Sequence, residues 1–111
     1  MPRQHERVSV SLEAVLEFGT AKNNARVSDI SRGGCFFDTL IDVASGDVIS
    51  FKLKGSDGTW MNLTGTAMHH FPGIGFGLRF TLPLTEEQRN FIYRIIFAQG
   101  GKLTGYVDTG K

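Results

Sequence analysis

The stretch Asp29-Ile30-Ser31-Arg32-Gly33-Gly34 has the pattern D-x-S-x-x-G and lies between two segments with strand-like sequences. Asp29 and Ser31 have short polar side chains that hydrogen-bond to nearby backbone or to a ligand edge. Gly33 and Gly34 permit positive φ and let a ligand approach the backbone closely. The pattern therefore predicts a tight turn able to hold a ligand, although polar turns match it by chance.

Two further motifs flank this turn. Arg3-Gln4-His5-Glu6-Arg7 has the pattern R-x-x-x-R, and Gly75-Phe76-Gly77-Leu78-Arg79-Phe80 begins a late strand. In identity, order and spacing, the three pieces resemble the PilZ domain family, whose hallmark is R-x-x-x-R followed by [D/N]-x-S-x-x-G. The resemblance extends over roughly residues 3–97, nearly the whole chain.

Alternation of apolar and polar residues predicts six strands. Within them we expect an irregularity near Ala14 and a bulge or bend at Gly65. We also expect a turn at residues 19–24, in which Asn23-Asn24 suits left-handed geometry. The predicted strands are 8–18, 25–30, 35–40, 47–54, 59–71 and 74–82.

The pattern changes after Pro83. Thr85-x-x-Gln88 fits a capping box, and the apolar stripe that follows has helical spacing. Gly100-Gly101 ends the pattern, so we expect a helix over residues 85–99. Strands at hairpin spacing followed by one amphipathic helix predict an all-β fold, a six-stranded antiparallel closed barrel with the C-terminal helix plugging one end. This agrees with the split barrel that the PilZ resemblance implies.

Length and composition predict one domain of 111 residues with a flexible N-terminal arm (1–7), a barrel plus helix (8–99) and a C-terminal tail (100–111). The formal net charge of +1 argues against nucleic-acid or membrane binding by bulk charge. No apolar run is long enough to span a membrane and no signal-peptide pattern is present, so we expect a soluble, cytoplasmic protein without membrane insertion.

The motif side chains suit a guanine nucleotide. The planar fork of arginine donates two parallel hydrogen bonds to a phosphate or to the Hoogsteen edge of guanine. A carboxylate such as Asp29 accepts from guanine N–H groups. Ser31 adds a small donor and acceptor, and Gly34 is expected to expose backbone N–H groups near an anion. Which guanine nucleotide binds does not follow from composition or spacing.

The PilZ resemblance implies that the ligand is cyclic di-GMP, a bacterial second messenger. It implies that Arg3 and Arg7 contact phosphate and guanine, and that Asp29, Ser31 and Gly34 line the guanine site. Secondary candidates for contact with the ligand are Arg32, Gly33, His5 and Arg79. The expected mechanism is a switch in which the arm orders on binding and a protein partner reads the new surface in trans.

Catalysis and a metal cofactor are not expected. The sequence shows no nucleophile–base set near Asp29 and Ser31. His69-His70 would face opposite sides of a strand without other ligands nearby. Cys35 is the single cysteine and is expected to be a buried small hydrophobe rather than a redox sensor.

Two alternative functions stay open from the sequence. One is a PilZ-like barrel that binds protein partners without a nucleotide. The other is a barrel that binds single-stranded RNA, for which Lys52, Lys54 and Trp60 give slight support. The downstream partner, the ligand stoichiometry and the choice between a monomer and a weak homodimer are left undecided, as is whether Trp60 is core or partner-facing.

Overall fold

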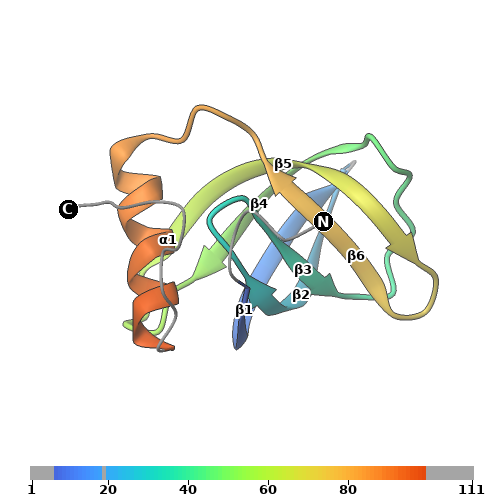
Figure 1. Cartoon of the computed structure of the whole chain (residues 1–111). Helices are drawn as coiled ribbons and strands as arrows, with labels where there is room; N and C mark the ends of the chain where they lie inside the picture. Colours follow the sequence, from blue (N-terminus) through green and yellow to red (C-terminus); the bar gives the residue numbers. More distant parts are fainter. Residues whose placement is uncertain (1–6, 19, 100–111) are drawn as a thin grey trace, which may run out of the picture.

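A computed structural model describes residues 7–18 and 20–99 of the chain. Six antiparallel strands close into a barrel in the order β1-β2-β3-β6-β5-β4, followed by one helix (Figure 1). This confirms the predicted all-β barrel. The elements are β1 (Val8–Phe18), β2 (Ala21–Ile30), β3 (Gly34–Asp38), β4 (Val48–Lys54), β5 (Trp60–Phe71), β6 (Gly75–Phe80) and α1 (Glu86–Ala98).

The barrel core follows from alternation along the strands. In β4, Ile49, Phe51 and Leu53 are buried while the residues between them face outward. Aromatic rings fill the centre, where the Phe37 ring lies 5.0 Å from that of Phe51 and 5.2 Å from that of Phe76, centroid to centroid. Burial of such large side chains is the main favourable term for a domain of this size.

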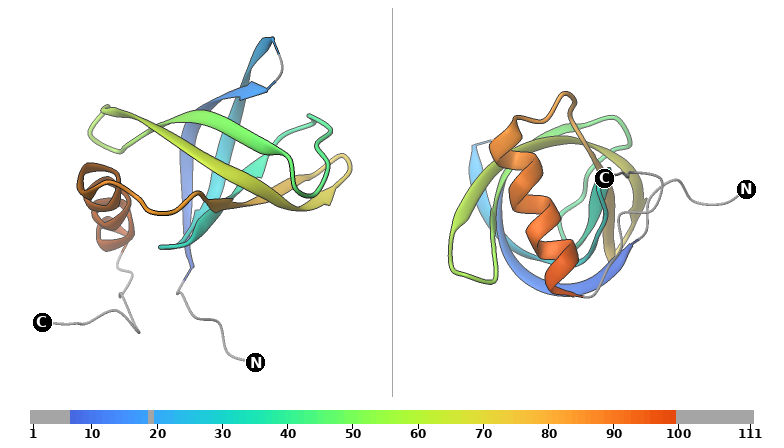
Figure 2. Two further views of the ribbon diagram at one scale, coloured as in Figure 1. Left: turned by 90° about the horizontal axis from the view of Figure 1, so that it is seen from above. Right: turned by 60° about the vertical axis from the view of Figure 1, so that its left-hand side comes forward.

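Helix α1 covers one end of the barrel (Figure 2). Thr85 is its N-cap: the Thr85 hydroxyl accepts from the backbone N–H of Gln88, and the Gln88 side chain accepts from the N–H of Thr85, which completes the predicted capping box. The apolar stripe of α1 faces the barrel core; its buried members are Phe91, Ile92, Ile95 and Ile96. Within the described part of the chain, no helix has the length and apolar character needed to cross a membrane.

The turn was predicted to extend over residues 19–24, which is too long. Strand β2 already begins at Ala21, and Asn23 and Asn24 pair with Leu16 and Val15 of β1. Asparagine favours turns through its local hydrogen bonds, but here the cross-strand ladder of the long β1–β2 hairpin outweighs that preference.

The expected irregularities also lie elsewhere. Ala14 and Gly65 pair regularly with both neighbouring strands. The register shifts occur at 9–12 in β1, at 27–29 in β2 and at 67–69 in β5. Gly65 has a packing role instead, because a Cβ there would come within 2.6 Å of the Arg79 carbonyl oxygen and closer still to the Leu78 side chain.

Candidate functional site

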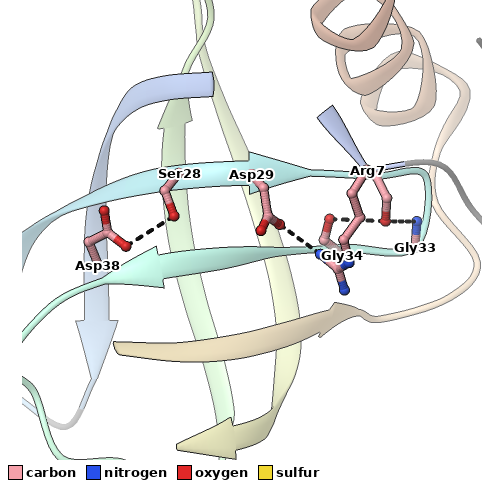
Figure 3. A network of polar contacts seen from close by, with 7 residues as sticks. Arg7, Ser28, Asp29, Gly33, Gly34 and Asp38 are labelled. Atoms are coloured by element: carbon pink, nitrogen blue, oxygen red, sulfur yellow. Dashed lines mark hydrogen bonds and ion pairs between the residues drawn. The ribbon is translucent and has the colours of Figure 1, made fainter. Parts of the chain in front are cut away.

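The D-x-S-x-x-G stretch forms the connection from β2 to β3, as predicted. The backbone N–H of Ser31 donates to the carbonyl oxygen of Gly34 at 2.8 Å. The Ser31 hydroxyl donates to the same oxygen at 3.4 Å and accepts from the N–H of Gly33 at 3.3 Å (Figure 3). Ser31 is only 3% exposed. Its side chain therefore closes the turn from within.

Gly34 allows close packing between strands and not an unusual backbone conformation. A Cβ at this position would lie 2.0 Å from the Leu78 carbonyl oxygen of β6. The described glycines with positive φ are Gly46, Gly58, Gly73 and Gly75, so the expectation of positive φ at Gly33 or Gly34 is not met. Because Gly34 is buried in the β3–β6 ladder, it does not present an open backbone cradle to solvent either.

Arg7 reaches the turn motif through the register of the first hairpin. Val8 pairs with Ile30 and Ser9 pairs with Asp29, so Arg7 precedes β1 at the point where β2 ends. Its Nη1 donates to Oδ1 of Asp29 at 2.7 Å (Figure 3). The two side chains are 42% and 34% exposed, so water screens the pair and its strength is modest. A guanidinium has five N–H donors, so this contact leaves donors for a second acceptor.

A pocket of about 360 Å³ opens beside this ion pair. It extends from the β2–β3 turn across β6 to β5. Two guanidinium groups, those of Arg7 and Arg79, belong to its wall, so it is suited to an anion. The predicted site residues that line it are Arg7, Ser31, Gly33, Gly34 and Arg79.

The remaining predicted residues differ in their relation to the pocket. Asp29 does not line the pocket itself and is ion-paired with Arg7, which does. Arg32 lies on the same turn, half-buried, and does not line the pocket. Arg3 and His5 lie outside the described residues.

Several pocket residues were not predicted. They are Met68, His69, Gly77, Leu78, Phe80 and Leu82. Their position follows from pairing: His69 lies opposite Gly77 on β6, and Gly77 lies opposite Phe36 on β3. Gly77 was the available signal, since a glycine on an outward strand face leaves open surface. At Gly77 an added Cβ would meet no atom closer than 4.0 Å.

Cys35 follows the motif and faces the core, as predicted. It is fully buried, and this burial raises the pKa of its thiol far above the ordinary value of 9.0; the nearby Asp29 carboxylate adds to the effect. A neutral buried thiol is a poor nucleophile and a poor redox sensor. Among the described residues no group of three or more histidine, cysteine, aspartate or glutamate side chains is placed to hold a metal ion.

The fold and the pocket define a small closed barrel with an arginine-lined surface site next to its D-x-S-x-x-G turn. The family model for the PilZ domain matches residues 2–98. The chain therefore belongs to the PilZ domain family, which confirms the resemblance seen in its motifs. A search of curated proteins found no significant match.

Solved structures with the same fold include a PilZ domain of YcgR from Escherichia coli with c-di-GMP. It is 17% identical with a TM-score of 0.71, and the match covers 90% of this chain and 92% of that one. The inhibitor of motility MotI/DgrA from Bacillus subtilis is 15% identical with a TM-score of 0.72, over 89% of this chain. This chain spans about half of that protein, 51% of its length.

A third similar structure is the PlzA protein of Borreliella burgdorferi in complex with c-di-GMP. It is 18% identical with a TM-score of 0.63, and the match covers 83% of this chain and 40% of that one. At these identities, the structural likeness shows a common fold.

Proposed function

We propose that this protein is a receptor for cyclic di-GMP. The observation that carries the proposal is the Arg7–Asp29 ion pair at the edge of a pocket that Arg79 also lines. The pair brings together the arginine and the carboxylate that we propose as guanine ligands, although 22 residues separate them in the chain. The E. coli and Borreliella relatives whose structures contain c-di-GMP support the choice of ligand.

The chemistry of the pocket fits this ligand. Arg7 and Arg79 supply planar donors for phosphate oxygens or for guanine N7 and O6. Asp29 supplies the acceptor for the guanine N1–H and N2–H groups. Arg3 joins this set from its place in R-x-x-x-R, and His5, Arg32 and Gly33 are further candidates.

Ser31 and Gly34 have an indirect role in this proposal. Their hydrogen bonds and close packing fix the end of β2, where Asp29 is located. Because the Ser31 hydroxyl is engaged with turn backbone, we propose binding and not catalysis at this site. No cofactor is required for such a receptor.

The proposed output is a switch. Ligand binding orders the N-terminal arm, residues 1–7, when its arginines meet the nucleotide. Such ordering costs conformational entropy and changes the shape of one surface. A protein partner then recognises that surface in trans.

Isothermal titration calorimetry with cyclic di-GMP tests the receptor, with GTP and cyclic di-AMP as competitors for specificity. We expect micromolar or tighter binding, about −8 kcal/mol. Arg7→Ala and Asp29→Ala should each weaken binding at least tenfold. Arg94→Ala is the matched control, because this arginine is exposed on α1 and does not line the pocket.

A wild-type protein that does not bind cyclic di-GMP would refute the proposed receptor function, and one that binds none of the three nucleotides would favour the alternative. The same domain would then be a nucleotide-independent interaction scaffold. Equal weakening by Arg94→Ala would show that the effect is one of overall charge and not of this pocket.

A further inference from the structure

Large apolar side chains are exposed at the β5–β6 hairpin and the loop that packs beside it. Leu40 is 82% exposed, Ile74 64% and Phe71 49%. The ring of Phe36 lies on the outer face of β3, 6.1 Å from the ring of Phe71. We call these four residues the hairpin surface. Figure 1 shows the β5–β6 hairpin on the side of the barrel away from α1.

Hydrogen bonds tie the loop that contains Leu40 to the neighbouring strands. The N–H of Thr39 donates to the Ile74 carbonyl at 3.3 Å. Further along, the Ser45 hydroxyl donates to the Met68 carbonyl at 2.8 Å, and the N–H of Gly46 donates to the Ala67 carbonyl at 2.8 Å. The apolar side chains are therefore presented from an ordered backbone, which lowers the entropy lost on binding.

Two glycines of β6, Gly75 and Gly77, lie next to the Phe36 ring. Gly77 is half-buried, and Gly75 is buried next to that ring. A Cβ on Gly75 would approach the Phe36 ring to 3.0 Å. The absence of side chains here lets Phe36 lie against the strand and leaves the aromatic pair accessible.

Acidic side chains outnumber basic ones at this surface, where Arg26 of β2 is the cross-strand partner of Asp38. The two segments that build it, residues 36–47 and 69–77, contain three aspartates (Asp38, Asp42 and Asp47) and no lysine or arginine. Asp38 accepts a hydrogen bond from Ser28, and Asp42 lies 3.6 Å from His70 with its side chain 90% exposed. The apolar residues thus have an acidic rim.

We propose that the hairpin surface docks an amphipathic, cationic segment of a partner protein. Leucine, isoleucine or aromatic residues of that segment would cover the hairpin surface, and its lysine or arginine residues would face Asp38 and Asp42. Apolar residues ringed by polar ones are typical of protein interfaces, and a complementary charge steers association. An anionic membrane surface is disfavoured, because its headgroups would be repelled by the same aspartates.

The hairpin surface is continuous with the pocket. Gly77 pairs with Phe36 on one side and with His69 on the other, and both Gly77 and His69 line the pocket. A partner on the hairpin surface would therefore border a ligand in the pocket. This inference rests on the proposed receptor function and identifies the chemistry of its partner.

A synthetic peptide of leucine and lysine with helical amphipathic spacing tests the proposal, titrated into isotopically labelled protein and followed by NMR. We expect amide shifts to change in residues 36–47 and 69–77. The double variant Leu40→Ser/Ile74→Ser and the double variant Asp38→Asn/Asp42→Asn should each bind at least tenfold more weakly. The control Val48→Ser, at an exposed residue on β4, should bind as wild type does.

Three results would overturn the proposal. They are equal affinity for a peptide with glutamate in place of lysine, shift changes centred elsewhere, and unchanged affinity in both double variants. Sedimentation of the free protein adds a fourth: a dimer that Leu40→Ser/Ile74→Ser dissociates would make a second copy the occupant.

Calorimetry with cyclic di-GMP on the same proteins separates the two proposals. Nucleotide binding without peptide binding refutes the docking surface alone. Peptide binding without nucleotide binding refutes the receptor alone.

Discussion

Replacing Gly34 with alanine tests whether the glycine of the D-x-S-x-x-G pattern serves the fold. The added Cβ would lie 2.0 Å from the Leu78 carbonyl oxygen, 3.1 Å from its carbonyl carbon and 3.2 Å from the Arg79 Cα. All three atoms belong to the backbone of β6. No rotamer change relieves such a clash, so β3 and β6 must separate.

The size of the effect follows from that geometry. Overpacking a well-packed interior costs about 1–3 kcal/mol, and more where backbone must move. Strand separation also weakens the ladder in which Gly34 pairs with Arg79. We therefore expect Gly34→Ala to lower the free energy of unfolding by about 3 kcal/mol and the melting temperature by about 12 °C, at about 4 °C per kcal/mol.

Thermal unfolding followed by circular dichroism measures this change, with Gly77→Ala as a matched control. Gly77 also lies on a strand and lines the pocket. The nearest atom to a Cβ added there would be 4.0 Å away. The free energy of unfolding of Gly77→Ala should stay within about 1 kcal/mol of that of the wild type. A melting temperature of Gly34→Ala equal to that of Gly77→Ala would refute the packing explanation and leave ligand access as the reason for the glycine.

Three further predictions concern the cap, the ion pair and the cysteine. Thr85→Ala should destabilise the protein by about 1 kcal/mol in urea unfolding, because it removes the acceptor for the Gln88 N–H, whereas Thr85→Ser should retain most of that stability. A double-mutant cycle on Arg7 and Asp29 should give a coupling energy below about 1 kcal/mol that falls further at high salt, and a value unaffected by salt would contradict the exposed geometry. The pKa of Cys35 is raised in the folded state, so the unfolded chain releases this proton first as pH rises. Stability should therefore decline above pH 9.0 by up to about 1.4 kcal/mol per pH unit from this group, and the decline should be smaller in Cys35→Ala.

The barrel was predictable because burial alternates along its strands. Residues 47–54 alternate so regularly that the predicted strand differs from β4 by one residue. The helix was equally predictable, since both partners of its capping box lie within four residues of sequence. The hairpin from β1 to β2 was not, because the turn preference of Asn23 and Asn24 is local and the ladder that overrides it depends on β1.

The motif residues of the site were predictable from the sequence, but the pocket residues on β5 and β6 were not. Arg7 and Asp29 follow from recognisable patterns, and the hairpin register brings them together. His69 and Gly77 reach the same pocket only because β5 and β6 pair beside β3. Such neighbours depend on contacts between distant segments, which a single sequence does not state.

The motif residues do not all support nucleotide binding equally, because some of them also have a structural role. Gly34 is required by the β3–β6 contact, and the Ser31 hydroxyl contributes to the turn, so both residues have a structural role whether or not the barrel binds a nucleotide. Arg7 and Asp29 form a half-exposed pair that contributes little to stability. A PilZ barrel that binds only proteins can lose that pair at small cost while it keeps the serine and the glycine. The presence of Arg7 opposite Asp29 is therefore the better support for the proposed nucleotide receptor, and under that proposal substitution of this pair should abolish cyclic di-GMP binding while leaving the barrel folded.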